Sequence, residues 1–397
     1  MLLQFKFKNH KCFLEENVLD LMATKEKRHL DSTIDINGNK VLPVVEIHGA
    51  NASGKSSLLE AMRFMFKMIK SSSRIDINNY LPVKPFLYSN KTFKQNSEYE
   101  ISIYLNDYEY RYGFSLNLDC IEEEWLYKKK FSATSVASQK VVFERYKDEV
   151  SFGSAYNKYE KTWNLFSSDI NIKKMLVLSN VAIKEEEGIF RSIYNFASKF
   201  YFSVENIFEK RVSIRLLDKK SSLYDKFQNI IKEFDPCLVG INIDEKENDT
   251  GDKSYNIMGI HKNIDGDEFT AIPLEQESAG TIKIFNILPI ILENLEVGGV
   301  LSIDELDIKL HPLLFKKIVS MYMDKKINKN NAQLIYTAHS TFLFKSDTLR
   351  RDQLYLVNKN SEGKANLYSL SEFRKLRVDA DYEKKYLSGQ FGAIPFI

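Results

Sequence analysis

The sequence has little cysteine and little excess charge, and each shortage excludes a class of protein. Three of its 397 residues are cysteine (Cys12, Cys120 and Cys237), and their wide spacing fits neither a disulfide framework nor a metal-binding pattern. The formal net charge is +2, so the composition neither indicates nor excludes nucleic acid as a partner. Any charged interface must therefore come from a local patch of the surface.

Long apolar runs are also missing. No run approaches the ~20 residues of a membrane-spanning helix, and the apolar stretch 285–292 is short and contains Pro289. Residues 1–6 do not have the apolar core of a signal peptide. Hydrophobic residues nevertheless make up 44% of the chain, which is enough to bury a large core. We expect a folded, soluble, cytoplasmic protein with no membrane partner.

The segment 49–56 reads Gly-Ala-Asn-Ala-Ser-Gly-Lys-Ser and fits the phosphate-binding pattern G-x-x-x-x-G-K-[ST]. A short apolar strand is predicted before it at 44–48, and a helix with one apolar face after it at 57–66. Loop and helix N–H groups would point at phosphate oxygens, which predicts ATP as a ligand. The alternative is a chance match, which the flanking strand and helix oppose. The predicted nucleotide-binding residues are Gly49, Asn51, Ala52, Ser53, Gly54, Lys55, Ser56 and Ser57.

Two of these side chains have specific expected roles. Lys55 would neutralise the β- and γ-phosphates, and the Ser56 hydroxyl would ligate Mg²⁺. Gly49 and Gly54 would allow a close approach of the backbone that a Cβ would block.

An antiparallel β subdomain is predicted in the first part of the chain. Alternation typical of half-buried strands occurs at 3–8, 98–105, 108–116, 121–127 and 141–146. Two short stretches there allow two interpretations each. Residues 9–13 either line the nucleotide base or form an ordinary turn. The Glu122–Glu124 run is either a metal ligand set or a solvated strand end, and we favour the second because successive strand residues face opposite ways.

The middle of the chain has weaker signals. Helices are predicted at 189–201 and 223–234, and short strands at 238–243, 254–260 and 268–272. We interpret this region as an α+β insertion between two halves of a nucleotide-binding fold. The expected domains are the N-terminal half 1–130, the inserted region 131–272 and the C-terminal half 273–397.

Strong patterns return in the last part of the chain. They predict a helix from about 277 to 296, a strand over 299–305, a helix beginning at Pro312, a strand over 333–340, and a hairpin of 353–357 with 365–370.

Polar side chains end two of these strands. Asp304 would hold Mg²⁺, Glu305 would polarise the attacking water as a general base, and His339 would hydrogen-bond the γ-phosphate or the water. The carboxyl ends of parallel strands are where such sheets bind ligands. The alternatives are a charged turn after an apolar strand and a structural histidine.

In this order, the motifs resemble those of the ABC-type ATPase heads of SMC, RecF and OLD-like proteins. The matching segments are the P-loop 49–56, Ser278-x-Gly280-Thr281, Asp304-Glu305, Asp307 and His339. The opening strand 5–9 is also similar, and the resemblance covers roughly 1–130 and 270–397. It implies an α/β P-loop NTPase of ABC-ATPase type with an antiparallel β subdomain and an inserted, mainly helical region.

The resemblance also implies roles and partners. Ser278 and Gly280 match the signature motif, which caps the γ-phosphate bound by a partner subunit in a head-to-head dimer. Asp307 matches the D-loop and His339 the switch histidine. The closing segment 386–395 resembles the tail of compact RloA-like and abortive-infection ATPases. The implied function is a Mg²⁺-dependent, ATP-hydrolysing homodimeric or larger switch in antiviral defence.

The sequence departs from the family in three places. The signature reads Glu-Ser-Ala-Gly-Thr, not Leu-Ser-Gly-Gly-Gln, which argues against a membrane exporter. The Q-loop is not evident, and Gln95 is the candidate. Only 58 residues follow His339, without the acidic clusters of a Toprim nuclease, so a nuclease or toxin would be a separate effector protein.

Three other functions are compatible with parts of the sequence. A RecF-like DNA-repair clamp would need a basic surface, for which Lys128–Lys130, Lys210-Arg211 and Lys384-Lys385 are available, although such runs are usually solvated faces. A GTPase is weakly indicated by 358–361, which lacks the required Asp. A non-enzymatic binding protein is opposed by the intact Lys55 and Glu305.

Overall fold

The computed structural model describes residues 1–76, 78–133, 138–166, 172–203, 212–217, 222–247, 253–266, 268–344, 348–373, 376–377 and 380–395. Among these residues the strands are β1 (Leu2–Lys8), β2 (Asn17–Asp20), β3 (Ile34–Ile36), β4 (Asn39–Val41), β5 (Val44–His48), β6 (Ser97–Leu105), β7 (Tyr108–Leu116), β8 (Ile121–Lys130), β9 (Lys140–Tyr146), β10 (Glu149–Phe152), β11 (Phe200–Ser203), β12 (Leu238–Glu247), β13 (Lys253–Lys262), β14 (Phe269–Pro273), β15 (Val300–Ile303), β16 (Gln333–Thr337), β17 (Leu354–Lys359) and β18 (Ala365–Ser369). The helices are α1 (Lys55–Ser71), α2 (Lys158–Asn164), α3 (Val177–Lys184), α4 (Ile189–Ser198), α6 (Ser222–Ile231), α7 (Ala279–Val297), α8 (Pro312–Met323) and α9 (Tyr382–Leu387).

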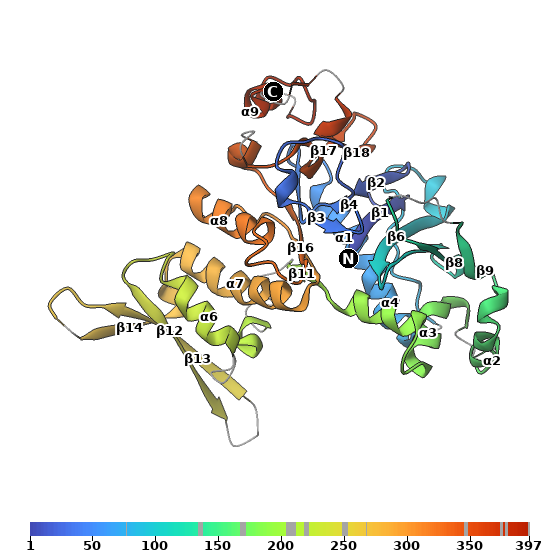
Figure 1. Cartoon of the computed structure of the whole chain (residues 1–397), viewed down its shortest axis with the longest axis horizontal. Helices are drawn as coiled ribbons and strands as arrows, with labels where there is room; N and C mark the ends of the chain where they lie inside the picture. Colours follow the sequence, from blue (N-terminus) through green and yellow to red (C-terminus); the bar gives the residue numbers. More distant parts are fainter. Residues whose placement is uncertain are drawn as a thin grey trace.

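A six-stranded, mostly parallel sheet forms the centre of the molecule, with strand order β11-β15-β16-β5-β17-β18 (Figure 1). All of its neighbouring pairs are parallel except β17 with β18. The strands β5, β15 and β16 are buried along their whole length, as expected for a sheet covered on both faces. Because these three strands are parallel neighbours, their carboxyl ends meet at one edge.

Alternation along the central strands divides the core into two clusters. Val45 and Ile47 of β5 pack with α1 and the antiparallel sheet, whereas Val44 packs with α7 and α8 on the opposite face. The period of two along the strand therefore determines which layer each side chain joins. The result is an α/β fold, as the sequence predicts, and its elements are arranged in three layers.

A second sheet, entirely antiparallel, lies beside α1 on the right of Figure 1, with order β10-β9-β8-β7-β6-β1-β2. The predicted hairpin is β6 and β7, which pair from Ser97–Leu116 to Leu105–Tyr108. The strands β9 and β10 belong to this sheet. The antiparallel strand predicted at 141–146 is β9, although the predicted start of the inserted region, at 131, separates it from the rest of the sheet. The strand β11 was assigned there too and instead pairs with β15 in the central sheet. Residues of the range 131–272 therefore contribute strands to three different sheets.

Glu124 corrects one sequence prediction. We expected Glu122–Glu124 to be a solvated strand end, but the Glu124 side chain is buried. Its carboxylate accepts hydrogen bonds from the backbone N–H groups of Val177 (2.7 Å) and Leu178 (3.0 Å), which begin α3, and from the Tyr112 hydroxyl (2.9 Å). The buried Arg145 guanidinium lies 3.9 Å away. A carboxylate from β8 thus satisfies the unpaired donors at the start of a distant helix.

We expect Glu124→Ala to lower the free energy of unfolding by about 3–5 kcal/mol, because it leaves a buried guanidinium without its counter-charge and two helix N–H groups without an acceptor. The exposed neighbour Glu123 provides the matched control, and Glu123→Ala should change stability by no more than ~0.5 kcal/mol. Urea unfolding of both variants measures the difference. Equal losses in the two variants would show that the Glu124 contacts contribute nothing to stability.

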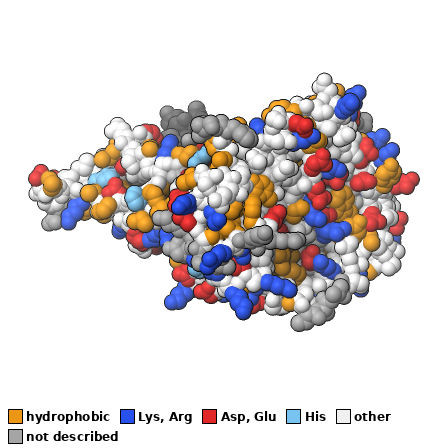
Figure 2. Space-filling view, turned by 90° about the horizontal axis from the view of Figure 1, so that it is seen from above, with side chains coloured by type: hydrophobic (Ala, Val, Ile, Leu, Met, Phe, Trp, Pro, Cys, Tyr) orange, Lys and Arg blue, Asp and Glu red, His pale blue; other side chains and the backbone are white. Residues whose placement is uncertain are grey.

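A three-stranded antiparallel sheet, β12-β13-β14, projects from the central body on the left of Figures 1 and 2. Helix α6 packs between this sheet and α7. A hydrogen bond between His261 Nε2 on β13 and Glu277 Oε1 (2.7 Å) joins this sheet to the central body. Glu277 immediately precedes Ser278, the first residue of the predicted signature segment. The helix predicted at 223–234 and the strands predicted at 238–243, 254–260 and 268–272 are confirmed, whereas the helix predicted at 189–201 ends at Ser198.

The closing segment of the chain packs under the carboxyl end of β5. The Tyr386 ring on α9 lies 6.1 Å from the buried His48 ring and 5.2 Å from Phe344, and the Tyr386 hydroxyl donates to the Ala393 carbonyl (3.1 Å). His48 directly precedes the P-loop, so the tail supports the strand that presents this loop.

Candidate functional site

The loop between β5 and α1 has the close packing that its glycines predict. Gly54 has φ +120°, and a Cβ there would lie 2.7 Å from Cys12 Sγ. A Cβ on Gly49 would lie 2.3 Å from the Val357 carbonyl oxygen. The β1–β2 connection and β17 therefore hold the loop from two sides, and only glycine fits at either position.

Lys55 lies at the start of α1 with its side chain folded back over the loop. Its Nζ donates to the carbonyl oxygens of Gly49 (2.8 Å) and Ala50 (3.2 Å). Burial lowers the pKa of the Lys55 ammonium, and the nearby carboxylates, Asp304 first among them, oppose that shift. The ammonium thus occupies the centre of the loop, with the carboxylates of Asp304, Glu305 and Asp307 as its nearby counter-charges.

The carboxyl ends of β15 and β16 place the predicted acidic residues beside this loop. The Thr337 hydroxyl at the end of β16 donates to Asp304 Oδ1 (2.5 Å) and accepts from the Glu305 N–H (2.8 Å). Glu305 has φ +52°, a left-handed conformation that costs free energy in a residue with a Cβ. Thr337 therefore holds the carboxylate of Asp304 and the backbone of Glu305 from the neighbouring strand.

His339 and Asp307 connect the two loops that follow these strands. His339 Nε2 lies 3.3 Å from Glu305 Oε1, and half of the Glu305 side chain surface (50%) is exposed. Asp307 Oδ2 accepts from the backbone N–H groups of His339 (3.0 Å) and Ser340 (2.7 Å). The predicted D-loop aspartate thus orients the loop that carries the predicted switch histidine.

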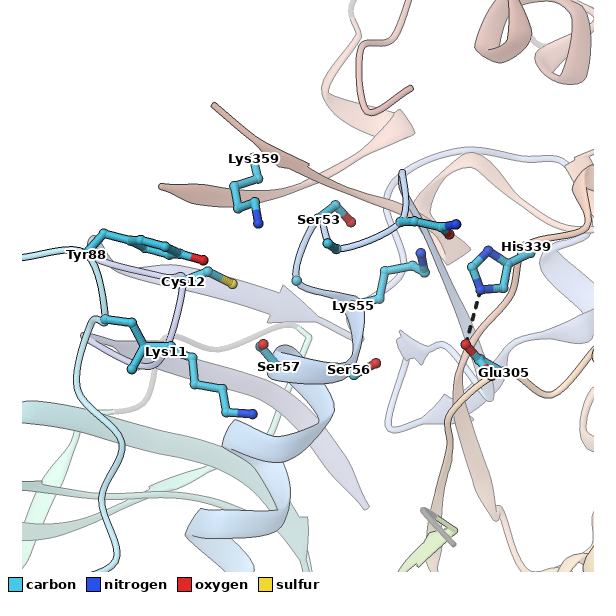
Figure 3. Close-up of a pocket in the computed structure, with 14 residues that line it drawn as sticks. Lys11, Cys12, Ser53, Lys55, Ser56, Ser57, Tyr88, Glu305, His339 and Lys359 are labelled. Atoms are coloured by element: carbon cyan, nitrogen blue, oxygen red, sulfur yellow. Dashed lines mark hydrogen bonds and ion pairs between the residues drawn. The ribbon is translucent and has the colours of Figure 1, made fainter. Parts of the chain in front are cut away.

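A cavity of about 700 Å³ lies over the loop and is also lined by Glu305 and His339, whereas Asp304, Asp307 and Thr337 lie behind its lining. Figure 3 shows the loop residues in its middle, Glu305 and His339 on one side, and Lys11, Cys12, Tyr88 and Lys359 on the other. Residues 9–13, expected either to line the base or to form a turn, form a turn that also contributes to the cavity lining. His10 and Phe13 form a tight backbone bridge, while Lys11 and Cys12 line the cavity. The full lining is Lys11, Cys12, Asn51, Ala52, Ser53, Gly54, Lys55, Ser56, Ser57, Leu87, Tyr88, Glu305, His339 and Lys359.

The family comparison identifies this arrangement. The family described as "AAA domain, putative AbiEii toxin, Type IV TA system" matches residues 47–345, about three quarters of the chain. The chain belongs to this AAA family. No curated protein sequence matches it. Among solved structures, that of an SMC head bound to the C-winged helix domain of ScpA is similar at a TM-score of 0.46 and 12% identity, covering 93% of this chain and 97% of that chain.

Membership of an AAA family implies a nucleoside triphosphate with a divalent metal, and the residues of the cavity fit this group. The Ser53 hydroxyl is buried in the loop and has no hydrogen-bond partner among the described residues, as expected for a group that would bond a phosphate oxygen. The first N–H groups of α1 likewise face the cavity without intrahelical acceptors. Ser56 and Asp304 would hold the metal. The described residues contain no group of three His, Cys, Asp or Glu side chains that could hold a metal ion.

Several cavity residues were absent from the sequence predictions. Leu87 and Tyr88 line the cavity but have no predicted role, and neither does Thr337, which lies behind the lining and contacts Asp304 and Glu305. Lys359 appears in the sequence predictions only within 358–361, the segment that weakly indicates a GTPase. In the structure it lines the cavity, and its ammonium lies over the Tyr88 ring, 5.9 Å from the ring centroid. Asn360 of that segment instead closes the β17–β18 turn by accepting from Glu362 and Lys364 N–H groups. One feature of the sequence could have identified Thr337: it is a hydroxyl residue at the end of a predicted strand, two residues before His339.

The signature residues do not line this cavity. Ser278 caps α7 by accepting from the Thr281 N–H (3.1 Å), and a Cβ on Gly280 would lie 3.2 Å from the Lys309 carbonyl oxygen, beside the D-loop. Gln95, the Q-loop candidate, is exposed and does not line the cavity either.

Several lysines of the basic runs considered for DNA binding contact other side chains of the protein. Lys128 lies over the Tyr108 ring (3.7 Å), and Lys129 pairs with Glu109 (2.9 Å). Lys385 donates to the Gln390 side chain (2.9 Å), and Lys210-Arg211 lies outside the described residues. Figure 2 shows Lys, Arg, Asp and Glu interspersed over the face it presents. Within the described part of the chain, no helix is long and apolar enough to cross a bilayer.

Proposed function

We propose that this chain is a Mg²⁺-dependent ATPase that acts as a dimeric switch. The observation that carries the proposal is that one cavity brings Lys55 and Ser56 of the P-loop together with Glu305 and His339 from two other strands. A protein that only binds nucleotide does not need a half-exposed carboxylate beside the phosphate site.

The residues divide the chemistry between them. Lys55 and the loop N–H groups bind the β- and γ-phosphates, while Ser56 and Asp304 hold Mg²⁺, which neutralises phosphate charge when bound. Glu305 is left free to accept a proton from water, because the Thr337 hydroxyl engages Asp304 and the backbone of Glu305 but not its carboxylate. His339, in contact with Glu305, orients the water or the γ-phosphate. Tyr88 offers an exposed ring for the base.

A second subunit would complete the site. Ser278 and Gly280 lie at the N-terminus of α7, whose N–H groups favour phosphate, yet this segment does not line the cavity of its own chain. Its position beside the D-loop supports a head-to-head homodimer, in which the α7 N-terminus of each subunit caps the nucleotide of the other.

Mixing two inactive variants tests this composite site. Lys55→Ala and Ser278→Arg should each abolish hydrolysis alone, but a mixed dimer contains one site with both lesions and one with neither. We expect recovery of a fraction of wild-type phosphate release, with subunit exchange confirmed by fluorescence transfer between labelled chains. The control is the double variant Lys55→Ala/Ser278→Arg, which should remain inactive at every concentration. No recovery despite demonstrated exchange would place Ser278 in the same site as its own Lys55.

We infer that the switch acts in antiviral defence through a separate effector, a nuclease or a toxin. The family description, which joins an AAA domain to an AbiEii toxin and a type IV toxin–antitoxin system, supports this inference. Purification of the chain from its native host with ATP present tests it. A nuclease or toxin recovered in fixed ratio supports the inference, and recovery of the chain alone, with and without ATP, contradicts it.

A further inference from the structure

A second cavity, of about 550 Å³, opens at the far end of α1. It lies between α1, the strand β11 at the edge of the central sheet, and the segment 212–217, and no step of the proposed ATPase reaction uses it. Lys70 follows Lys55 by 15 residues on the same helix, so at about 1.5 Å per residue these two lysines are attached roughly 22 Å apart along α1.

Three cations on α1 line one wall of this cavity. Arg63, Lys67 and Lys70 are spaced by four and three residues, which places them in a row along one face of the helix. None of the three forms an ion pair with a carboxylate among the described residues. Burial lowers the pKa of the Lys70 ammonium, so this lysine is partly withdrawn from water, unlike a lysine on an ordinary solvated face. The positive charges of this row of three side chains are therefore not neutralised by a carboxylate of the described residues.

Aromatic side chains of β11 form another part of the lining. Phe200 is buried and stacks on Phe66 (centroids 3.9 Å apart), and Phe202 stacks on Phe200 (4.6 Å, interplanar angle 20°). Phe202 and Tyr201 are only partly buried and line the cavity. Rings held rigidly by stacking offer flat apolar surface to a ligand at little cost in side-chain entropy.

The acidic side chain near this part of the lining does not balance the row on α1. Glu293 of α7 faces Arg215 and Tyr201, and desolvation raises the pKa of its carboxyl group. Arg215, which also lines the cavity, is the cation that lowers this pKa. The nearby negative charge is thus directed at Arg215, and Arg63, Lys67 and Lys70 remain available to an anionic ligand.

We propose that this cavity is a binding site for single-stranded nucleic acid. A row of cations that follows the phosphates, facing aromatic rings on which bases stack, is the combination that single strands require. A duplex keeps its bases stacked inside and cannot place one against Phe202 and Tyr201 within the cavity. The helix that carries the cations begins at Lys55, so a bound strand would contact the same rigid element that presents the P-loop.

Fluorescence anisotropy with labelled ten-residue oligothymidylate, without ATP or Mg²⁺, tests the proposal. We expect Lys67→Ala/Lys70→Ala to raise the Kd at least about tenfold, because charge-assisted hydrogen bonds to phosphate are among the strongest. The matched control Lys326→Ala/Lys329→Ala removes the same charge from an exposed turn and should leave the Kd within about twofold. Binding by Lys55→Ala protein should equal that of the wild type, because the P-loop is a different site.

Two further measurements separate this site from general electrostatic attraction. Phe202→Leu keeps an apolar side chain but removes the ring, and should weaken oligothymidylate binding several-fold while thermal unfolding stays near that of the wild type. A ten-base-pair duplex should bind the wild type at least about tenfold more weakly than the single strand. Oligouridylate distinguishes DNA from RNA as the source of the strand. Equal affinity for duplex and single strand, or equal Kd values for the two double-lysine variants, would overturn the proposal.

Discussion

Protein carrying Lys55→Ala is expected to fold normally and to lose high-affinity binding of Mg²⁺-ATP. The ammonium is the only cation among the described residues within hydrogen-bond distance of the loop carbonyls of both Gly49 and Ala50, and it marks the position the β- and γ-phosphates would take. Loss of a buried charge-assisted contact to phosphate should weaken binding by at least about 100-fold. Removal of a partly desolvated ammonium leaves no unpaired charge in the core, so stability should change little.

Isothermal titration calorimetry with Mg²⁺-ATP measures the loss, beside thermal unfolding of the same samples. The control is Lys326→Ala, a lysine on an exposed turn far along the chain, whose affinity for ATP should match that of the wild type. Tight ATP binding by a folded Lys55→Ala protein would mean that the loop does not bind the phosphates.

Sequence reasoning worked best where a local pattern determines the structure. The alternation in β6 and β7, the glycine-bounded loop before α1, and Pro312 at the start of α8 each depend on residues close in sequence, and all three predictions are confirmed. It failed at Glu124, because the acceptor role of this side chain is created by α3, more than fifty residues later. It also failed at β11, a four-residue strand whose place in the central sheet depends on pairing with β15.

In the candidate site, too, sequence reasoning missed the residues whose roles depend on distant parts of the chain. Lys55, Glu305 and His339 were predicted because each ends or begins an element with a recognisable pattern, and the structure brings them to one cavity. Thr337 and Tyr88 were missed because their roles come only from neighbours: β15 beside β16 for Thr337, and Lys359 over the ring for Tyr88. A threonine at the end of a strand and a tyrosine in a loop are individually unremarkable, and no spacing rule connects them to the P-loop.

Glu305→Gln is expected to retain ATP binding and to lose turnover by ~10²–10⁴-fold, the usual contribution of a general base. Glutamine has nearly the same shape but does not accept the proton of the attacking water. The backbone of Glu305 should keep its place, because Thr337 holds it through the main-chain N–H, which the substitution does not alter. Asp304→Asn should behave differently, since it weakens the metal site and therefore ATP binding itself.

Two measurements on the same protein decide the role of Glu305. A phosphate-release assay reports turnover, and light scattering with ATP and Mg²⁺ reports whether Glu305→Gln accumulates as a dimer, as expected if hydrolysis is what separates the subunits. Glu383→Gln is the matched control, because that carboxylate accepts from Thr341 on the neighbouring loop but does not line the cavity, and its turnover should stay near that of the wild type. Wild-type turnover in Glu305→Gln would transfer the general-base role to His339, whose ring is in hydrogen-bond contact with Glu305 at the same edge of the sheet.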